Sequence, residues 1–271
     1  MNRARRELAT LMPSQDVVIE ILDARLPASS ANPLVTELRR SKPCIKVLTK
    51  SDLADPAVTQ AWLDHFQRDS KVAAFASTTR RPQETKRRIA ELSRGMAAHR
   101  GADQGVRALI VGVPNVGKST LVNMLANRKV AAVGDKPAVT KEQQRVVLDG
   151  GMILTDSPGI TWTKFADEAG AHRLAFAGSI PDTAIDYVSI ALFGAAFLLE
   201  RYPELIVARY KLDATPASPA ALLDAIGRKR GKLRAGGVLD LDKAAEILVH
   251  EFRAGTLGPI SLESPPARTA G

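Results

Sequence analysis

The clearest indication of how this 271-residue chain folds is the run Gly112-Val113-Pro114-Asn115-Val116-Gly117-Lys118-Ser119. It matches the pattern G-x-x-x-x-G-K-[S/T], and it lies between an apolar run at 107–113 and a helical pattern at 119–127. Its glycines let backbone N–H groups turn inward around a phosphate. Lys118 adds a cation for the β- and γ-phosphates, and the Ser119 hydroxyl is a ligand for Mg²⁺. The stretch therefore predicts a phosphate-binding loop; the alternative is a glycine turn that happens to precede a helix.

A second motif, Asp156-Ser157-Pro158-Gly159, follows an apolar run and begins 38 residues after the lysine of the phosphate loop. That separation is typical of P-loop nucleotide hydrolases. We expect Asp156 to hold Mg²⁺ through water and the Gly159 N–H to contact the γ-phosphate and register its loss. Between the two motifs, Thr140 is the candidate for a switch threonine that reaches Mg²⁺ and the γ-phosphate. The alternative for Thr140 is a loop residue exposed to solvent.

The base specificity is predicted from Thr49-Lys50-Ser51-Asp52, which ends an earlier apolar run. The Asp52 carboxylate can accept hydrogen bonds from the N1–H and exocyclic amine of guanine, which adenine does not offer. Lys50 can lie along the base and the phosphate loop, and Thr49 stands where Asn is commoner. A looser match, Ala76-Ser77-Thr78, supplies a further contact to the base. A charged strand end is the alternative for so short a motif, but the phosphate loop favours guanine binding.

The order of these motifs predicts a circularly permuted domain. The base-reading motif precedes the phosphate loop by about 60 residues, whereas it ordinarily follows that loop. The same sheet can still form, because domain termini often lie close together. Apolar runs alternate with helical patterns, which predicts an α/β fold whose mostly parallel sheet has helices on both faces. The expected strands are 17–22, 44–48, 72–75, 107–113, and a hairpin of 145–148 with 152–155.

The pattern changes to helical after about residue 165. We expect one long apolar helix over 182–201, closed by Pro203, and shorter helices over 219–226 and 241–253. A strand is expected only near 260–262, before a frayed tail. The division is therefore a permuted P-loop GTPase domain over 1–168 and a small helical domain over 169–271.

The composition excludes several classes of protein. Hydrophobic residues make up 45% and charged residues 25%, which excludes wholesale disorder, and the single Cys44 excludes a disulfide scaffold. No apolar run reaches the roughly 18–20 residues that a bilayer helix needs, and the N-terminus lacks a secretion signal, so we expect no membrane insertion. The net charge of +9 suggests a polyanionic partner. Basic residues are concentrated in 80–107 and 228–234; the alternative for the first is a solvated helix face.

The chain resembles the YlqF/RbgA family of circularly permuted GTPases, which act in assembly of the large ribosomal subunit. The resemblance rests on the motifs above, on Asp23-Ala24-Arg25-Leu26-Pro27, on Asn32-Pro33 and on Gly227-Arg228-Lys229-Arg230-Gly231. It implies a cytoplasmic GTPase that uses Mg²⁺, binds GTP and GDP, and associates with the large-subunit precursor and its rRNA. It also implies a K⁺ ion beside Asn115, for which backbone turn chemistry is the alternative. We expect a monomer.

The predicted site combines these motifs. The nucleotide contacts are Thr49, Lys50, Ser51, Asp52, Ala76, Ser77, Thr78, Asn115, Val116, Gly117, Lys118, Ser119, Thr120 and Gly159. The metal ligands are Ser119, Thr140 and Asp156 for Mg²⁺ and Asn115 for K⁺, while Lys118 and Thr140 are the expected transition-state and switch contacts.

Two departures from related enzymes bear on catalysis. Ile160 stands where Ras-like enzymes carry the glutamine that orients water. The family is thought to use a histidine from an N-terminal G-H-M segment instead, and this chain starts at Met1-Asn2-Arg3, just past that segment. His172 is nearest in sequence to Asp156, but a structural role for it is simpler. Either the true start of the protein lies upstream of Met1, or the protein works without the histidine of the G-H-M segment. The sequence therefore assigns no residue to orient the attacking water.

Three functions follow from these motifs. The first is a slow GTPase switch that the large ribosomal subunit stimulates. The second is a nucleotide-gated RNA- or ribosome-binding module with little intrinsic GTPase activity, because the histidine segment is absent. The third, an ATP-dependent enzyme, is disfavoured by Asp52.

Overall fold

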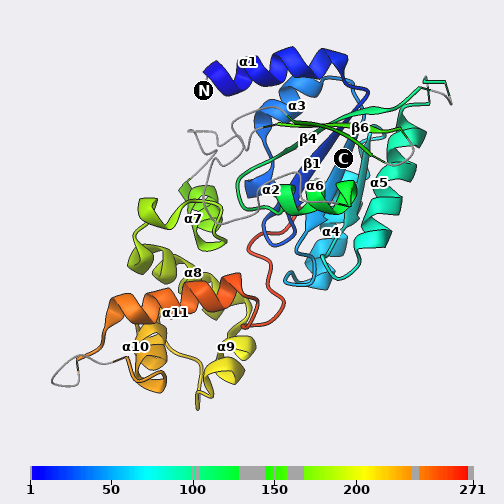
Figure 1. Cartoon of the computed structure of the whole chain (residues 1–271). Helices are drawn as coiled ribbons and strands as arrows, with labels where there is room; N and C mark the ends of the chain where they lie inside the picture. The colour runs from blue at the N-terminus through cyan, green and yellow to red at the C-terminus, as the bar shows by residue number, and fades with distance from the viewer. Residues whose placement is uncertain are drawn as a thin grey trace. The chain divides into compact units, whose positions relative to one another are not determined.

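The computed structural model describes residues 2–98, 100–101, 104–127, 144–148, 151–157, 168–232 and 238–267. The chain divides into two compact units (Figure 1). The first comprises Met1–Lys164 together with Glu263–Gly271, and the second comprises Phe165–Leu262. The chain therefore leaves the first unit, forms the second, and returns to the first.

The first unit is built on a sheet with the strand order β3-β2-β1-β4-β6-β5, as far as the described residues show. Neighbouring strands are parallel except for the antiparallel pair β5 and β6. The predicted mostly parallel sheet is confirmed, and each strand begins and ends within one residue of its predicted position. The strands are β1 (Val17–Asp23), β2 (Cys44–Thr49), β3 (Val72–Ala76), β4 (Arg107–Gly112), β5 (Gln144–Val147) and β6 (Ile153–Asp156).

Helices cover both faces of this sheet. The helices are α1 (Asn2–Leu11), α2 (Pro27–Ser30), α3 (Pro33–Arg39), α4 (Pro56–Phe66), α5 (Pro82–Met96) and α6 (Lys118–Ala126). On one face, Leu8, Val35 and Phe66 from α1, α3 and α4 pack against Val18 of β1. Side chains alternate along a strand, so Ile19 faces the other way. On that side, α5 and α6 contact each other and the strands β2 and β4 (Figure 1).

The second unit is helical. It contains α7 (Glu168–Phe176), α8 (Tyr187–Arg201), α9 (Pro203–Tyr210), α10 (Pro219–Lys229) and α11 (Leu241–Arg253). Helix α8 contacts the other four, so its apolar surface forms the centre of this unit. No helix within the described residues is both long and apolar enough to cross a bilayer.

Three expectations for the second unit are wrong in detail. The long helix begins at Tyr187 and not at 182, because the side chain of Asp186 accepts a hydrogen bond from the Val188 N–H and caps it. Pro203 does more than end that helix, since it is the first residue of α9. The expected strand near 260–262 does not form; the apolar residues there are buried in an irregular segment.

The segment from Glu263 belongs with the first unit, whereas the predicted division placed it with the helical domain. The Glu263 carboxylate accepts hydrogen bonds from the N–H groups of Ala28 and Ser29, the latter at 2.9 Å, and from the Ser29 hydroxyl at 2.6 Å. The Trp62 indole donates to the Glu263 carbonyl over 3.2 Å. These bonds fasten the returning chain to α2 and α4, which is why it joins this unit.

Candidate functional site

The candidate site lies where the parallel strands end. Asp23 at the end of β1 is opposite Thr49 of β2, and Asp156 at the end of β6 is opposite Ile110 of β4. The chain runs from β1 outward to β2 and β3, and from β4 to β6 on the other side. The boundary between β1 and β4 is therefore a topological switch point, where ligands bind in sheets of this kind.

The phosphate loop follows β4 and turns into α6. Gly117 has a φ of +94°, which favours glycine, and it is followed directly by Lys118 at the start of the helix. Asn115 has a φ of +60°, and asparagine tolerates this left-handed conformation better than most residues. The backbone turn thus accounts for Asn115 without an ion, and the K⁺ contact stays a prediction.

Lys118 and Asp156 form a buried ion pair across the site. The Lys118 ammonium lies 2.5 Å from Oδ1 of Asp156, and the two side chains are 7% and 0% exposed. The second oxygen of Asp156 is buried and has no hydrogen-bond partner among the described residues. An unpartnered carboxylate oxygen is the kind of group that a hydrated divalent cation satisfies, so the residues present fit the predicted Mg²⁺.

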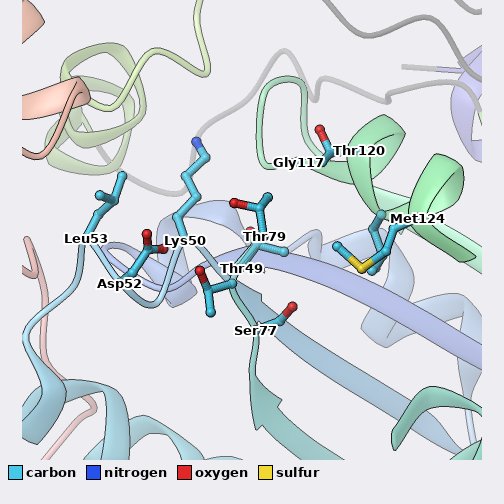
Figure 2. A pocket seen from close by; sticks show the side chains of 11 residues that line it. Thr49, Lys50, Asp52, Leu53, Ser77, Thr79, Gly117, Thr120 and Met124 are labelled. Atoms are coloured by element: carbon cyan, nitrogen blue, oxygen red, sulfur yellow. The ribbon is translucent and has the colours of Figure 1, made fainter. Parts of the chain in front are cut away.

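A cavity of about 200 Å³ opens beside the base-reading motif (Figure 2). Thr49, Lys50 and Asp52 line one side of it, and Thr120 and Met124 of α6 line the opposite side (Figure 2). The cavity is further lined by Leu53, Ser77, Thr78, Thr79, Gly117 and Leu121. The sequence therefore located most of the polar lining but missed the apolar contribution of α6, because residues of this kind also occur on helix faces that only pack.

The base-reading motif is bonded to the backbone of the phosphate loop. The Thr49 hydroxyl oxygen lies 2.5 Å from the Val116 carbonyl and 2.9 Å from the Leu22 carbonyl, so its single proton bridges both. The Lys50 ammonium donates to the Asn115 carbonyl over 2.7 Å. Threonine thus supplies the link between the two loops at a position where asparagine is commoner.

The remaining predicted contacts divide into two kinds. Ser51 does not line the cavity; its hydroxyl donates to the Ser77 carbonyl over 3.0 Å and joins the two base loops. Ala76 ends β3 and also lies outside the lining. Val116 and Ser119 belong to the phosphate loop and the first turn of α6. The predicted residues Thr140 and Gly159, and also Ile160, lie outside the described residues.

Asp52 is the accessible acidic group of the cavity. Its side chain is 22% exposed, and Oδ2 lies 3.4 Å from Nε of Arg80, whose own side chain is 76% exposed. So long and solvated a contact is weak. A ligand with two adjacent donors can therefore displace Arg80 and bind the carboxylate.

Part of the predicted RNA-binding cluster is engaged inside the second unit. Arg230 donates to Glu251 over 2.6 Å, and Arg209 holds both oxygens of the same carboxylate at 2.8 and 2.9 Å. The Arg230 guanidinium also lies 5.7 Å from the centre of the Tyr210 ring. Arg230 and Lys232 are both exposed, but the guanidinium of Arg230 already contacts Glu251 and Tyr210.

The histidines that the structure describes have aromatic neighbours. His172 lies against Phe193, with ring centres 5.0 Å apart, and His65 meets the edge of Trp62 at 5.5 Å. His250 lies 3.2 Å from the hydroxyl of Tyr187. None of the three lines the cavity.

Comparisons with known proteins agree with this geometry. Residues 107–192 match the family model described as 50S ribosome-binding GTPase. The ribosome biogenesis GTPase A of Bacillus licheniformis is 42% identical over 98% of this chain and 96% of its own length. The ribosome biogenesis GTPase A of Thermotoga maritima is 31% identical over 98% of this chain and 92% of its own length. The crystal structure of GNP-bound YlqF from T. maritima matches with a TM-score of 0.68 and 27% identity, over 97% of this chain and 98% of that one. The chain belongs to the ribosome biogenesis GTPase A (YlqF/RbgA) family, as the resemblance of its motifs predicts.

Proposed function

We propose that the protein binds and hydrolyses GTP and acts as a switch in assembly of the large ribosomal subunit. The observation that carries the proposal is the cavity at the sheet edge. There the guanine-reading carboxylate of Asp52 is accessible, and Lys50 is bonded to the phosphate loop at Asn115. The printed names of the relatives, which describe GTPases of ribosome biogenesis, support the same function.

Each part of the site has a distinct task toward GTP. Asp52 accepts from the guanine N1–H and amine, Lys50 and Met124 enclose the base, and Ser77 and Thr78 close its far side. The N–H groups from Asn115 to Thr120 surround the phosphates. Ser119 and, through water, Asp156 would hold Mg²⁺, which when bound neutralises charge on the β- and γ-phosphates. Thr140 and Gly159 remain the proposed switch contacts.

Lys118 changes partner as GTP binds. In the structure its ammonium is held by Asp156. A nucleotide offers it the oxygens of the β- and γ-phosphates, where it stabilises charge in the transition state. The release of Lys118 would also free Oδ1 of Asp156, so that both oxygens of this carboxylate would be available to hold Mg²⁺ through water. Ile160 stands where Ras-like enzymes carry the water-orienting glutamine, so we expect slow intrinsic turnover.

The proposed partner is the precursor of the large subunit and its rRNA. Among the described basic residues of the second unit, Lys232 is exposed at the end of α10, and Arg228 and Lys229 are exposed beside it. These side chains suit contact with phosphate groups, and binding should weaken steeply as salt rises. We propose that the protein binds this precursor in the cytoplasm as a monomer.

A second candidate is a nucleotide-gated ribosome-binding module that hardly hydrolyses GTP. The observation that favours it is Ile160, which stands where Ras-like enzymes carry the glutamine that orients the attacking water. In that case GTP would order the switch segments and set affinity for the particle without rapid turnover.

The deciding experiment is GTP turnover in K⁺ buffer with and without purified large ribosomal subunits. A strong rise with subunits supports the GTPase switch. An unchanged rate with tight, GTP-dependent binding to the subunit supports the binding module. Replacing K⁺ by Na⁺ tests the ion at Asn115. An absence of any GTP binding would refute both functions, and Asp52→Asn, which should bind GTP much more weakly than wild type, serves as the control for guanine-dependent binding.

A further inference from the structure

Asp23 lies at the centre of the site but outside every motif assigned to the nucleotide. It is the last residue of β1, it is 0% exposed, and it lies beside Thr49 in the sheet. Its own N–H donates to the Ser30 hydroxyl over 3.0 Å, which fixes the backbone there. A fully buried carboxylate at the carboxyl edge of a sheet needs specific partners.

Two cations satisfy that carboxylate. Its Oδ1 accepts from the backbone N–H and Nε of Arg25, both at 3.0 Å, and its Oδ2 accepts from a terminal nitrogen of Arg25 at 2.8 Å. The same Oδ2 accepts from the Lys50 ammonium at 2.9 Å. Burial alone would raise the pKa of Asp23, but the charges of Arg25 and Lys50 outweigh it and hold that pKa well below its usual range. The contacts of Arg25 and Lys50 therefore stabilise Asp23 as an anion at neutral pH.

This arrangement orients Lys50. A lysine side chain has four rotatable bonds, and holding it in one conformation costs conformational entropy. The fork of Arg25 fixes the plane of the carboxylate, because guanidinium and carboxylate match in two parallel bonds. The Lys50 ammonium then lies between Asp23 and the carbonyl of Asn115. The stem of Lys50 thereby forms one wall of the cavity before any ligand enters (Figure 2).

We propose that Asp23, fixed by Arg25, is a positioning residue for nucleotide binding, which holds Lys50 against the phosphate loop so that the guanine cavity is preformed. The inference rests on the proposed function, since it assumes that the cavity takes a guanine nucleotide. It assigns a task to the run Asp23-Ala24-Arg25, which the nucleotide motifs leave unexplained. Preorganisation of this kind raises affinity by lowering the cost of ordering the site.

The test is a double-mutant cycle on nucleotide affinity. The dissociation constant for fluorescent GDP is measured for wild type, Asp23→Asn, Lys50→Met and the double variant. We expect Asp23→Asn to weaken binding about tenfold, as the loss of one charged hydrogen bond would. If Asp23 acts through Lys50, it should add little to the loss already caused by Lys50→Met. The inference would be overturned if Asp23→Asn weakened GDP binding as much in the Lys50→Met protein as in wild type. It would also be overturned if Asp23→Asn alone left the affinity for GDP unchanged.

A matched control separates positioning from folding. Asp16 is a buried carboxylate at the start of the same strand, and it pairs with Arg100 at 3.0 Å and with Arg107 at 3.3 Å. Asp16→Asn should lower the thermal midpoint as Asp23→Asn does, yet leave the affinity for GDP unchanged. If both variants weaken GDP equally, the effect of Asp23 is merely structural.

A second variant covers the case in which Asp23→Asn does not fold, because it leaves Arg25 buried without its carboxylate. The pair Asp23→Asn with Arg25→Gln removes both charges and should fold. It should show the same loss of GDP affinity, and wild-type affinity in this pair would refute the positioning role. The two failures are distinguishable. If the wild type does not bind GDP, the proposed function is refuted. If the wild type binds GDP but the effects of Asp23→Asn and Lys50→Met are independent, only the inference is refuted.

Discussion

The ammonium of Lys118 lies 2.5 Å from a carboxylate oxygen of Asp156, and both groups are buried at the end of the sheet. A residue that has to reach phosphate therefore begins with a protein partner. Removing one member of such a pair leaves an uncompensated buried charge. The pair stabilises the folded first unit, and the phosphates of a nucleotide must compete with it.

We expect Lys118→Met to lower the free energy of unfolding of the first unit by about 3 kcal/mol, because Asp156 is left buried and unpaired. Adding Asp156→Asn should restore most of that loss. Urea unfolding followed by tryptophan fluorescence measures this, since Trp62 and Trp162 both belong to the first unit. A Lys118→Met protein as stable as wild type would show that the pair contributes nothing.

Asp52→Asn should change the base that the cavity selects. An amide cannot accept from both the N1–H and the amine of guanine, so the affinity for GTP should fall by about a hundredfold. Xanthine carries an oxygen in place of that amine, and the new amide can donate to it. Competition of fluorescent GDP by GTP, XTP and ATP gives the order of preference. Tight retention of GTP by Asp52→Asn would place the base elsewhere.

Arg230 and Lys232 lie two residues apart and should behave differently. Arg230→Gln loses the bond to Glu251 and the contact with Tyr210, so it should lower the thermal midpoint of the second unit. Lys232→Gln should leave that midpoint unchanged and weaken binding to large-subunit RNA, with a smaller salt slope. The measurements are circular dichroism melting and RNA titration at several salt concentrations. If both variants weakened RNA binding equally and neither lowered the thermal midpoint, the packing role of Arg230 would be contradicted.

The second unit should lose stability in acid through Glu251. Burial raises the pKa of this carboxyl, but the hydrogen bonds from Arg209 and the charges of Arg230 and Arg209 outweigh burial and lower the pKa below its usual value of 4.5. A lowered pKa in the folded state means that the stabilisation is present above pH 4.5 and is lost as the pH falls further. Melting curves from about pH 3 to pH 7 should show a steeper acid loss in wild type than in Glu251→Gln. Parallel curves would exclude Glu251 as the cause.

Glu263→Ala should loosen the returning chain. The amides of Ala28 and Ser29 lose their carboxylate acceptor, so their hydrogen exchange should accelerate. Ser264→Ala, at the exposed neighbouring position, is the control and should leave both amides protected. Unchanged exchange in Glu263→Ala would mean that water replaces the carboxylate without cost.

The sequence predicted the sheet well because its strands are short apolar runs that end in polar turns. It also located the phosphate loop and Asp156, since each follows a strand directly. Helix α4 was not predicted, although Asp55 caps it and Pro56 occupies its first turn, the usual signals of a helix start. Helix α9 was missed because Pro203 was interpreted only as the end of the preceding helix.

Contacts between segments far apart in the chain could not be predicted from the sequence. The bond from Lys50 to Asp23 depends on the register of β1 with β2, which brings residues 27 positions apart into contact. The engagement of Arg230 depends on the packing of α10 beside α11. A local pattern of basic residues does not show which of them already have partners.

Because the chain returns to the first unit at Glu263, the helical unit is an insertion within that unit's sequence and not a C-terminal domain. A truncation that stops at Lys164 would remove the segment from Glu263 onward, which belongs to the nucleotide-binding unit, along with the helices. Excising 165–262 and bridging the cut with a flexible peptide would keep that segment in place. The helical unit is thus an insertion in the chain of the nucleotide-binding unit, and both ends of its segment must be rejoined in any deletion of it.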